Sequence, residues 1–459
     1  MGSELQTYSL SDLGKIVTGK TPPAKIKTAY AEGHGTLFVT PRDMDGRRWI
    51  DSTERYLSGE GLLSVQRNLV PSGSIAVSCI GSDMGKAILV KDNSVTNQQI
   101  NSLLVDKTRF NPLYVYYVLS TKQQYLKDIA GGSATPILNK TDFGKVTIQL
   151  PLKAVQDEIA NLLDVFDSKI ELNRQINQTL EQMAQTLFKS WFVDFDPVMD
   201  NALDAGNPIP DELQHRAEAR KAVRESEGFK PLPDEVRQLF PDAFEESELG
   251  WVPKGWGVGC LANIASYTSN RVATTTLSLN NYVSTENMLA EKKGIVEAAN
   301  LPTVNTVPAY TTGNVLISNI RPYFKKIWMA NGDGGHSNDV LGFQVKEQNT
   351  EGYLFNLLYQ DALFEFMMTT AKGSKMPRGD KKAILDWQLV IPPYELREYF
   401  SLRVGDFYVS SSKRTEENKT LTKLRDTLLP KLISGELRLD DVELAVEQEA
   451  VSAEQQNER

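Results

Sequence analysis

The sequence is poor in the residues on which enzymes most often rely. Its 459 residues include two cysteines, Cys79 and Cys260, and three histidines. Two isolated thiols make neither a disulfide framework nor a zinc knuckle, and we expect a reducing, cytoplasmic environment. The histidines, His34, His215 and His336, lie far apart, so a histidine-based catalytic triad is not expected.

Signals for membrane insertion and secretion are also lacking. No run of about 18 apolar residues occurs, so no membrane-spanning helix is expected. The start of the chain has neither the basic nor the apolar segment of a signal peptide. With 41% hydrophobic and 24% charged residues, the composition is that of a globular protein, and the length predicts two or more domains.

The formal net charge of −9 argues at first against nucleic-acid binding, but the charge is unevenly distributed. Residues 194–250 carry a net charge of −9 and residues 440–459 carry −6. Residues 1–150 carry +4 and residues 251–392 carry +2. Since a charge must be localised before it indicates a partner, these two weakly basic blocks give modest support for DNA binding.

Some segments resemble catalytic motifs, but each is incomplete. The segment Ile391–Tyr394 reads Ile-Pro-Pro-Tyr, but isoleucine cannot bond an adenine amino group as a methyltransferase motif requires, so we interpret the segment as a strand-to-helix junction. Gly81–Lys86 is one residue too short for a phosphate loop. The carboxylates within 242–246 lack the lysine of a nuclease metal site. The sequence therefore predicts a binding protein rather than an enzyme.

A single internal duplication with an offset near 240 residues is the strongest structural signal. Five segments recur in the same order: Phe38–Met44 with Tyr282–Met288, Gly73–Ile80 with Gly313–Ile320, Thr96–Ile100 with His336–Val340, Gly132–Pro136 with Gly373–Pro377, and Asn177–Leu180 with Asn418–Leu421. Chance does not give five ordered pairs. Each copy combines a mixed α/β part with a long helix.

The α/β parts are marked by short β-rich segments bounded by glycine, proline or asparagine. Ser74–Cys79, Ala87–Val90 and Val146–Leu150 are predicted strands, and Pro112–Ile129 has helical character.

The long helices are predicted over about Ala154–Trp191 and Glu395–Leu429, where apolar residues recur at spacings of three and four. A helix of such length needs a partner for its apolar stripe, so we expect the two to pair. Asn177 and Asn418 match across the repeat within these stripes and are expected to fix the register of the pair.

Between the copies lies an acidic, proline-rich connector, in which Ala217–Arg224 is a candidate short helix. The tail after Leu439 is rich in Glu, Gln and Ala and is expected to be frayed. An aromatic cluster before the connector has two open interpretations, a hydrophobic core or a docking surface for a partner. Its members are Phe188, Trp191, Phe192 and Phe195.

Four motifs resemble one protein family, the specificity subunits of type I restriction–modification systems. They are Leu10–Pro22, Leu187–Pro197, Glu248–Trp256 and Lys431–Arg438. The resemblance implies a mixed α/β fold in which two target-recognition domains are separated by two long, antiparallel, paired helices. Each domain would read one half of a split, asymmetric DNA site.

The resemblance also implies domain limits and partners. The expected segments are recognition domain 1 over 1–151, the first spacer helix over 152–193, the connector over 194–250, recognition domain 2 over 251–392, the second spacer helix over 393–439 and the tail over 440–459. Besides double-stranded DNA, the partners would be two modification (methyltransferase) subunits and, in some complexes, two restriction subunits. This chain would bind no cofactor and no metal; S-adenosylmethionine, ATP and Mg would be held by the partner subunits.

Base reading needs donors and acceptors at a groove edge, with Arg suited to guanine and Asn or Gln to adenine, whereas phosphate contacts position the protein. In the first copy the candidate DNA-binding residues are Lys20, Thr21, Arg42, Arg47, Arg48, Ser82, Lys86, Asn97, Gln98, Asn139 and Lys140. In the second copy they are Asn270, Arg271, Arg321, Tyr323, Lys325, Lys326, Lys375, Arg378, Lys381 and Lys382.

Two alternatives stay open at this point. Lys86 and Lys326 are equivalent in the repeat, which favours a shared phosphate contact, although either could be a solvated surface charge. Asn97 could cap a turn instead of reading a base. For the whole chain, the alternative is a coiled-coil protein adaptor that binds no nucleic acid, which the acidic balance would suit.

Overall fold

The computed structural model describes residues 5–130, 137–373 and 375–439. The chain forms two compact units, and each contains the α/β part of one copy of the repeat together with portions of both long helices. Unit 1 combines residues 1–172 with 417–459, and unit 2 comprises residues 173–416. One repeated segment, Gly132–Pro136, lies outside the described residues.

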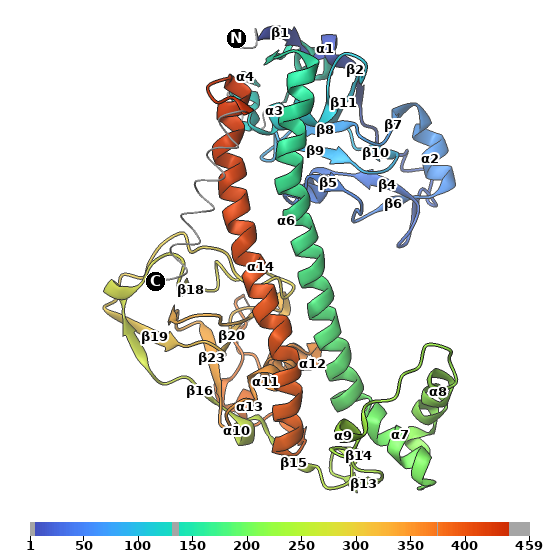
Figure 1. Ribbon diagram of the computed structural model, residues 1–459, viewed down its shortest axis with the longest axis vertical. Helices are drawn as coiled ribbons and strands as arrows, with labels where there is room; N and C mark the ends of the chain where they lie inside the picture. The colour runs from blue at the N-terminus through green and yellow to red at the C-terminus, as the bar shows by residue number, and fades with distance from the viewer. Residues whose placement is uncertain (1–4, 131–136, 374, 440–459) are drawn as a thin grey trace. The chain divides into compact units, whose positions relative to one another are not determined.

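Unit 1 contains two five-stranded sheets and a two-stranded one (Figure 1). The first sheet has the order β2 (Gly14–Thr18), β11 (Ile100–Val105), β8 (Ile75–Ser78), β9 (Ala87–Val90) and β5 (Trp49–Ile50). The second has the order β3 (Tyr30–Ala31), β6 (Tyr56–Leu57), β4 (Thr36–Val39), β10 (Ser94–Thr96) and β7 (Leu69–Val70). The antiparallel pair is β1 (Gln6–Ser9) with β12 (Thr147–Leu150). The three strands predicted from sequence are therefore confirmed as β8, β9 and β12.

The short helices of unit 1 are α1 (Leu10–Leu13), α2 (Gly59–Val65), α3 (Pro112–Ser120), α4 (Gln123–Ile129) and α5 (Lys140–Lys145). The single helix predicted over Pro112–Ile129 is thus two helices. The break follows from hydroxyl groups, because Ser120 and Thr121 donate to the carbonyls of Tyr117 and Val118 and so compete with the helical ladder.

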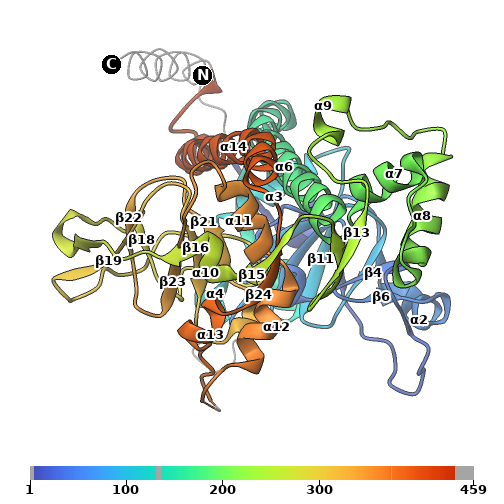
Figure 2. The ribbon, with the colours of Figure 1, turned by 90° about the horizontal axis from the view of Figure 1, so that it is seen from below.

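Unit 2 contains two four-stranded sheets (Figure 2). The first has the order β16 (Ala265–Tyr267), β23 (Val340–Val345), β20 (Val315–Ser318) and β21 (Ile327–Met329). The second has the order β17 (Arg271–Ala273), β19 (Thr306–Tyr310), β22 (Gly334–His336) and β18 (Tyr282–Val283). Strand β15 (Gly257–Cys260) pairs with β24 (Gln388–Ile391). Helices α10 (Leu261–Ile264), α11 (Glu351–Leu358), α12 (Asp361–Thr369) and α13 (Lys381–Leu385) complete this α/β part.

The strand orders confirm the duplication. The order β2-β11-β8-β9 in unit 1 matches β16-β23-β20-β21 in unit 2. In each second sheet one parallel pair is kept, β4 with β10 and β18 with β22. The offset is 240 residues between β8 and β20, but 251 between α1 and α10, so the second copy has 11 fewer residues than the first between its first helix and its central strand.

Two long helices, α6 (Lys153–Phe188) and α14 (Tyr394–Ser434), each contribute to both units. In unit 1 Asp167 contacts Arg425 and Ile170 contacts Asn418, so the residue numbers rise on one helix as they fall on the other. In unit 2 Asn177 contacts Ser411 and Phe188 contacts Phe400 in the same sense. The predicted antiparallel pairing of two long helices is therefore confirmed.

The helix α14 ends five residues later than the sequence indicated, at Ser434 instead of Leu429, and includes Pro430. A proline inside a helix costs roughly 3 kcal/mol. Burial of Leu428, Leu429 and Leu432, which are 7%, 7% and 2% exposed, offsets this cost by holding the last turns against unit 1.

Asn177 and Asn418 occupy equivalent places and make equivalent bonds. The Asn177 Nδ2 donates to the Ser411 carbonyl (3.2 Å), and the Asn418 Nδ2 donates to the Ile170 carbonyl (3.3 Å). Since Ile170 and Ser411 are themselves matched in the repeat, each asparagine ties its helix to the partner helix at one register. The role predicted for this pair is confirmed.

The strand-to-helix junctions are equivalent too. The Gln156 side chain donates to the Pro151 carbonyl (2.8 Å), and the Arg397 side chain donates to the Pro392 carbonyl (3.0 Å). Ile391–Tyr394, the segment that approaches a methyltransferase motif, is thus the turn between β24 and α14, as its structural interpretation predicted.

The aromatic cluster at the end of α6 lies in the core of unit 2. Phe188, Trp191, Phe192 and Phe195 are 1% to 9% exposed, and they pack on Tyr353, Phe400 and Trp256. One turn of π-helix over Lys189–Val193 inserts an extra residue. Of the two open interpretations, the structure supports the core.

The connector is folded. It contains α7 (Asp196–Ala205), α8 (Gln214–Arg224), α9 (Asp234–Arg237), β13 (Phe244–Ser247) and β14 (Gly250–Pro253). The helix predicted at Ala217–Arg224 is α8, which begins three residues earlier. None of the described helices is both long and apolar enough to cross a lipid bilayer.

Candidate nucleic-acid interface

The structure assembles three candidate residues of the first copy at the end of β2 and β10. The Thr21 hydroxyl donates to Gln98 Oε1 (2.6 Å) although 77 positions separate the two residues. The backbone N–H of Lys20 donates to the Thr96 carbonyl (2.8 Å). The side chains of Lys20, Thr21 and Gln98 are exposed, so this cluster presents a cation, a hydroxyl and an amide together.

Two candidate asparagines of the first copy make hydrogen bonds that stabilise the local fold. Asn97 is 9% exposed, and its side chain bonds both the backbone N–H and the Oε1 of Gln99 (3.1 and 3.0 Å), which makes it a turn residue. Asn139 caps α5 by accepting from the Asp142 N–H (3.0 Å). Its counterpart in the second copy, Asp380, caps α13. Lys140, the first residue of α5, is exposed.

Two of the three candidate arginines between β4 and β5 lie near the surface. Arg42 is 84% exposed and only 3.9 Å from Glu54. Arg47 pairs with Asp45 and Asp51, each at 3.0 Å. Partial burial raises the pKa of the Asp45 carboxyl, but the hydrogen bonds that it accepts from Arg47 lower this pKa by more. The net shift of the pKa is therefore downward. Arg42 is therefore the arginine of this pair whose charge is least neutralised.

Arg48 instead faces inward and belongs to a buried ionic cluster. We define the Asp167 cluster as Arg48, Tyr117, Asp164, Asp167 and Arg425. The Arg48 side chain is 12% exposed; its Nη1 lies 2.6 Å from Asp164 and donates to the Tyr117 hydroxyl (2.8 Å). This internal position contrasts with the exposed loop position that the sequence suggested for Arg48.

Asp167 stands at the centre of this cluster and is 8% exposed. It accepts from the Tyr117 hydroxyl (2.7 Å) and from Arg425 (2.5 Å). Burial raises the pKa of Tyr117, and the charge of Asp167 raises it further. Burial lowers the pKa of Arg425, but the hydrogen bonds and charges of Asp167 and Asp426 together raise it by more, so the net shift is upward. The cluster therefore joins the α/β part of unit 1 to both α6 and α14.

Lys86 and Lys326 make similar contacts within the protein, each with a backbone carbonyl of the same repeated segment but at different positions in it. The Lys86 Nζ lies 3.4 Å from the Met44 carbonyl and 2.7 Å from Asp83. The Lys326 Nζ donates to the Thr285 carbonyl (2.6 Å). Each lysine ties the loop after the central strand to the preceding loop of its own copy. This shared contact explains their equivalence within the fold, and a phosphate contact by either remains a prediction. Ser82, in the same loop as Lys86, is exposed.

In the second copy, two candidate segments lie side by side. The Arg321 N–H donates to the Pro377 carbonyl (2.8 Å), and Ile320 forms a β-bridge with Arg378. Tyr323 is 46% exposed, and Lys325 pairs with Asp361 at 3.0 Å. The structure thus brings the loop between β20 and β21 next to the loop before α13.

The remaining candidates of the second copy are distributed over two places. Lys375, Lys381 and Lys382 are exposed, while Arg378 pairs with Asp339 at 3.2 Å. Asn270 and Arg271 lie at the start of β17, where the Arg271 guanidinium bonds Thr306 (2.7 and 3.0 Å). No contact recorded among the described residues joins Arg271 to the loop of Arg321.

The sequence reasoning missed the turn that supports the Arg321 loop. Lys292 pairs with Asp361 at 2.6 Å, and its Nζ lies 4.5 Å from the Tyr359 ring centroid. The Glu-Lys-Lys-Gly run at Glu291–Gly294 would have signalled a charged turn. The loop that this turn supports, Arg321–Lys326, however lies about 30 positions away, and nothing in the sequence signals that the two segments are in contact.

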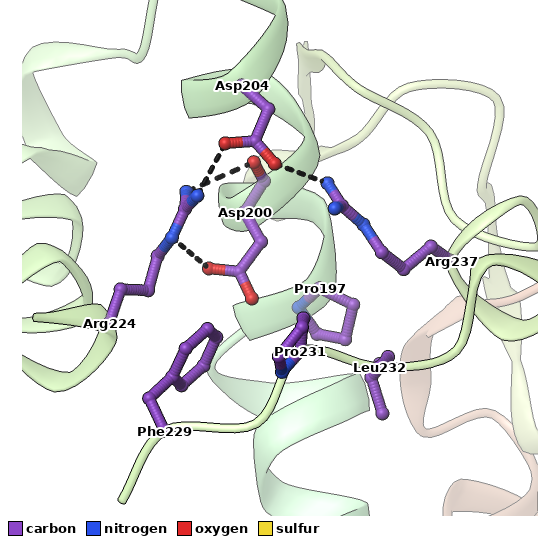
Figure 3. A pocket seen from close by; sticks show the side chains of 8 residues that line it. All are labelled: Pro197, Asp200, Asp204, Arg224, Phe229, Pro231, Leu232 and Arg237. Atoms are coloured by element: carbon purple, nitrogen blue, oxygen red, sulfur yellow. Dashed lines mark hydrogen bonds and ion pairs between the residues drawn. The ribbon is translucent and has the colours of Figure 1, made fainter. Parts of the chain in front are cut away.

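Part of the charge of the acidic connector is paired within the connector. Figure 3 shows Asp200 and Asp204 of α7 beside Arg224 and Arg237 at a small pocket. Arg224 and Arg237 lie 2.5 and 2.7 Å from Asp204. Because each charged side chain that lines this pocket already has an ionic partner, the pocket offers no unneutralised charge to a ligand.

The described residues hold no group of three or more His, Cys, Asp or Glu side chains that could bind a metal ion. Cys79 is buried, and burial raises the pKa of its thiol to about 11, far from that of a nucleophile. His336 is 3% exposed and lies against Ser337 and Thr268.

The features above define a class: a duplicated α/β protein that presents two different sets of exposed polar loops and carries them on paired helices. Comparison with known proteins indicates what this architecture is similar to. Residues 2–182 match the family described as the type I restriction modification DNA specificity domain. Nearly the whole chain is similar to specificity subunits of type I restriction enzymes.

Individual relatives show this similarity over nearly the whole chain. The MjaIX specificity subunit of Methanocaldococcus jannaschii is 25% identical over 439 residues, which cover 94% of this chain and 93% of that protein. The HindI specificity subunit of Haemophilus influenzae is 24% identical, with coverage of 95% and 100%. The crystal structure of the S subunit from M. genitalium shares the fold, with a TM-score of 0.55 at 14% identity, over 94% of this chain and 96% of that one.

Proposed function

We propose that this chain determines the DNA sequence on which a type I restriction–modification complex acts, and that it performs no chemistry itself. Its two α/β domains, residues 1–151 and 251–392, each read one half of a bipartite, asymmetric DNA site. The observation that carries the proposal is the duplication: one strand order occurs twice, with different exposed side chains on the equivalent loops.

The duplication has a physical reason in the ligand. A DNA backbone has local twofold symmetry, and a protein with two related domains can place the same element against each half of a site. Conserved internal contacts, such as those of Lys86 and Lys326, keep the two scaffolds alike. Divergent loops, such as Gly81–Lys86 and Arg321–Lys326, then let the two half-sites differ.

The partners follow from the same proposal. Two modification subunits dock on the chain and carry S-adenosylmethionine and the methylating residues, and restriction subunits supply the ATP- and Mg-dependent steps. The paired helices α6 and α14 hold the two reading domains at a set spacing, which fixes the length of the unread gap. The names of the relatives, which are specificity subunits of type I restriction enzymes, support this division of labour.

Domain exchange tests the proposal. The full chain is purified with its modification subunits, and the methylated motif is determined by methylome sequencing in cells with and without the gene. Exchange of residues 1–151 for those of a relative is expected to change one half-site and leave the other and the gap unchanged. A motif that changes in both halves, or no methylation that depends on this chain, would contradict the proposal.

A further inference from the structure

Strained backbone is concentrated at one place in unit 2. Of the six non-glycine residues with positive φ in the described chain, four lie in two adjoining loops. They are Glu291 (55°), Lys292 (60°), Arg321 (50°) and Lys325 (50°). Residues with a side chain rarely adopt this conformation, and such strain collects at functional sites when the surrounding structure enforces it.

The first copy shows that the fold does not require side chains at these positions. The residues equivalent to Arg321 and Lys325 are Gly81 and Gly85, with φ of 87° and 84°. Glycine adopts this region without strain, so the same backbone path is formed there at lower cost. The second copy therefore has an arginine and a lysine where glycine would be more stable.

Several contacts hold the strained loop rigid. The Glu291 N–H donates to the Phe324 carbonyl (2.8 Å), and the Lys292 N–H donates to the Lys325 carbonyl (2.9 Å). Asp361 pairs with both Lys292 and Lys325. A loop fixed in this way can present its side chains in one geometry without ordering them at each binding event.

The side chains at the tip of this loop are aromatic and exposed. Tyr323 is 46% exposed and Phe324 is 37% exposed, with ring centroids 4.6 Å apart. The segment Ile320–Lys326 has three cations and no carboxylate. The Arg321 Nε is buried and has no hydrogen-bond partner in the described structure. Lys325 is paired with Asp361, whereas Arg321 and Lys326 have no ion pair recorded among the described residues, so the tip combines apolar rings with two cations that lack a carboxylate partner.

We propose that Arg321–Lys326, the aromatic loop, is a wedge that stacks Tyr323 and Phe324 on bases of the second half-site. Aromatic and other apolar side chains pack on base faces or between base steps, and flanking cations contact the phosphates. The positive charge of the loop favours a polyanion over an apolar protein surface. This inference rests on the proposed function.

The first copy has no counterpart to the wedge. There Asp83 and Met84 replace Tyr323 and Phe324 at the same offset as the two glycines, Met84 is fully buried, and Asp83 pairs with Lys86. The two half-sites are therefore read by different means. Loss of the wedge affects discrimination at one half-site and not at the other.

The test uses the full chain in complex with its modification subunits and three DNA duplexes. One carries the motif found by methylome sequencing, one has the first half-site scrambled, and one has the second scrambled. The second half-site is the one that changes when residues 251–392 are exchanged. Binding is measured by competition for the wild type, for Tyr323→Ser/Phe324→Ser, and for Tyr125→Ser, which removes a 42% exposed aromatic residue from α4 of the first copy.

The affinity of the double variant for the motif is expected to fall by about fivefold to 150-fold per stacked base. Its discrimination against the scrambled second half-site should also fall, because the cost of opening a base step for a wedge depends on the sequence of that step. Its discrimination at the first half-site, its thermal unfolding and the behaviour of Tyr125→Ser should match the wild type. Unchanged discrimination in the double variant, or an equal loss at both half-sites, overturns the wedge. A wild-type complex that distinguishes none of the three duplexes overturns the proposed function instead.

The strain gives a second measurement. Arg321→Gly/Lys325→Gly adopts the backbone of the first copy and keeps both rings, so it is expected to unfold at a higher temperature than the wild type. It should bind all three duplexes more weakly, with a smaller dependence on salt, because phosphate contacts are lost. A variant that is more stable and binds as tightly, with the same salt dependence, would show that these two cations do not serve DNA binding.

Discussion

The substitution Asp167→Asn tests the energetic role of the Asp167 cluster. It keeps the side-chain volume but removes the carboxylate that contacts Arg48, Tyr117 and Arg425 together. Removal of one partner from a buried ion pair costs about 3–5 kcal/mol. Arg48 retains Asp164 at 2.6 Å and Arg425 retains Asp426 at 2.8 Å, so we expect a smaller loss of about 2–3 kcal/mol.

The measurement must resolve unit 1, because a chain with two units need not unfold in one transition. Hydrogen exchange followed by mass spectrometry on peptides from α3 and the first half of α6 reports the local free energy of opening. Both segments should exchange faster in Asp167→Asn. The matched control is Tyr408→Phe at the equivalent place in unit 2, which removes a hydroxyl that accepts from Asn356 (2.6 Å) and should cost about 1 kcal/mol there.

A double-mutant cycle separates the ion pair from simple loss of packing. Arg425→Met removes the second cation while keeping an apolar stem, so the double variant Asp167→Asn/Arg425→Met should be destabilised by about 1–2 kcal/mol less than the sum of the single variants. Additive effects within about 0.5 kcal/mol, or a cost below about 1 kcal/mol for Asp167→Asn alone, would refute the reasoning. The pair would then behave as an exposed one despite its burial.

Three further predictions concern the spacer and two buried titratable groups. Insertion of one helical turn into both α6 and α14 should lengthen the gap in the methylated motif by about one to two base pairs, from 5.4 Å per turn and 3.4 Å per base pair, with the bases read unchanged in methylome sequencing. Burial lowers the pKa of His336, so the unfolded chain takes up a proton at a higher pH than the folded chain, and stability should fall as the pH drops below 6.5. In His336→Gln the dependence of stability on pH should be flatter in that window, and an unchanged slope of stability against pH would contradict this. Burial raises the pKa of Glu181, so the ionised form of this carboxyl opposes folding at pH values above its ordinary pKa of 4.5. Glu181→Gln keeps the hydrogen bond to Tyr359 and should raise the denaturation midpoint at pH 7. A lower midpoint would count against this prediction.

The architecture could be predicted from the sequence because it depends on repeated and periodic residue patterns. The duplicated motifs and the apolar stripes of α6 and α14 are sums over many residues, and small local errors do not disturb them. The register of the helix pair was accessible for the same reason, since Asn177 and Asn418 match in both copies. Local interruptions, such as the break between α3 and α4, depend on single hydroxyl groups and were not foreseen.

The candidate interface was less accessible, because residue type does not reveal what a side chain faces. Arg48 and Arg42 are both arginines of one exposed-looking segment, yet Arg48 is 12% exposed in an ionic cluster and Arg42 is 84% exposed. The partner that decides the difference, Asp164, is over a hundred positions away. The strained turn at Glu291 and Lys292 was missed for a related reason, since positive φ at a charged residue has no sequence signature.

The two units use different side chains to join the α/β part to the long helices. Asp167 in unit 1 and Tyr408 in unit 2 are equivalent positions on paired helices, and each contacts an equivalent residue of the α/β part, Tyr117 or Asn356. A charged centre flanked by two arginines therefore joins domain to helices in one unit, and a neutral amide–hydroxyl pair does so in the other. Because a buried carboxylate facing Asn356 would lack a cation, the α/β part of each unit fits its own helix ends better than those of the other unit. The difference between the copies thus favours the correct pairing of each domain with its helices, while the shared strand order keeps both domains alike as readers.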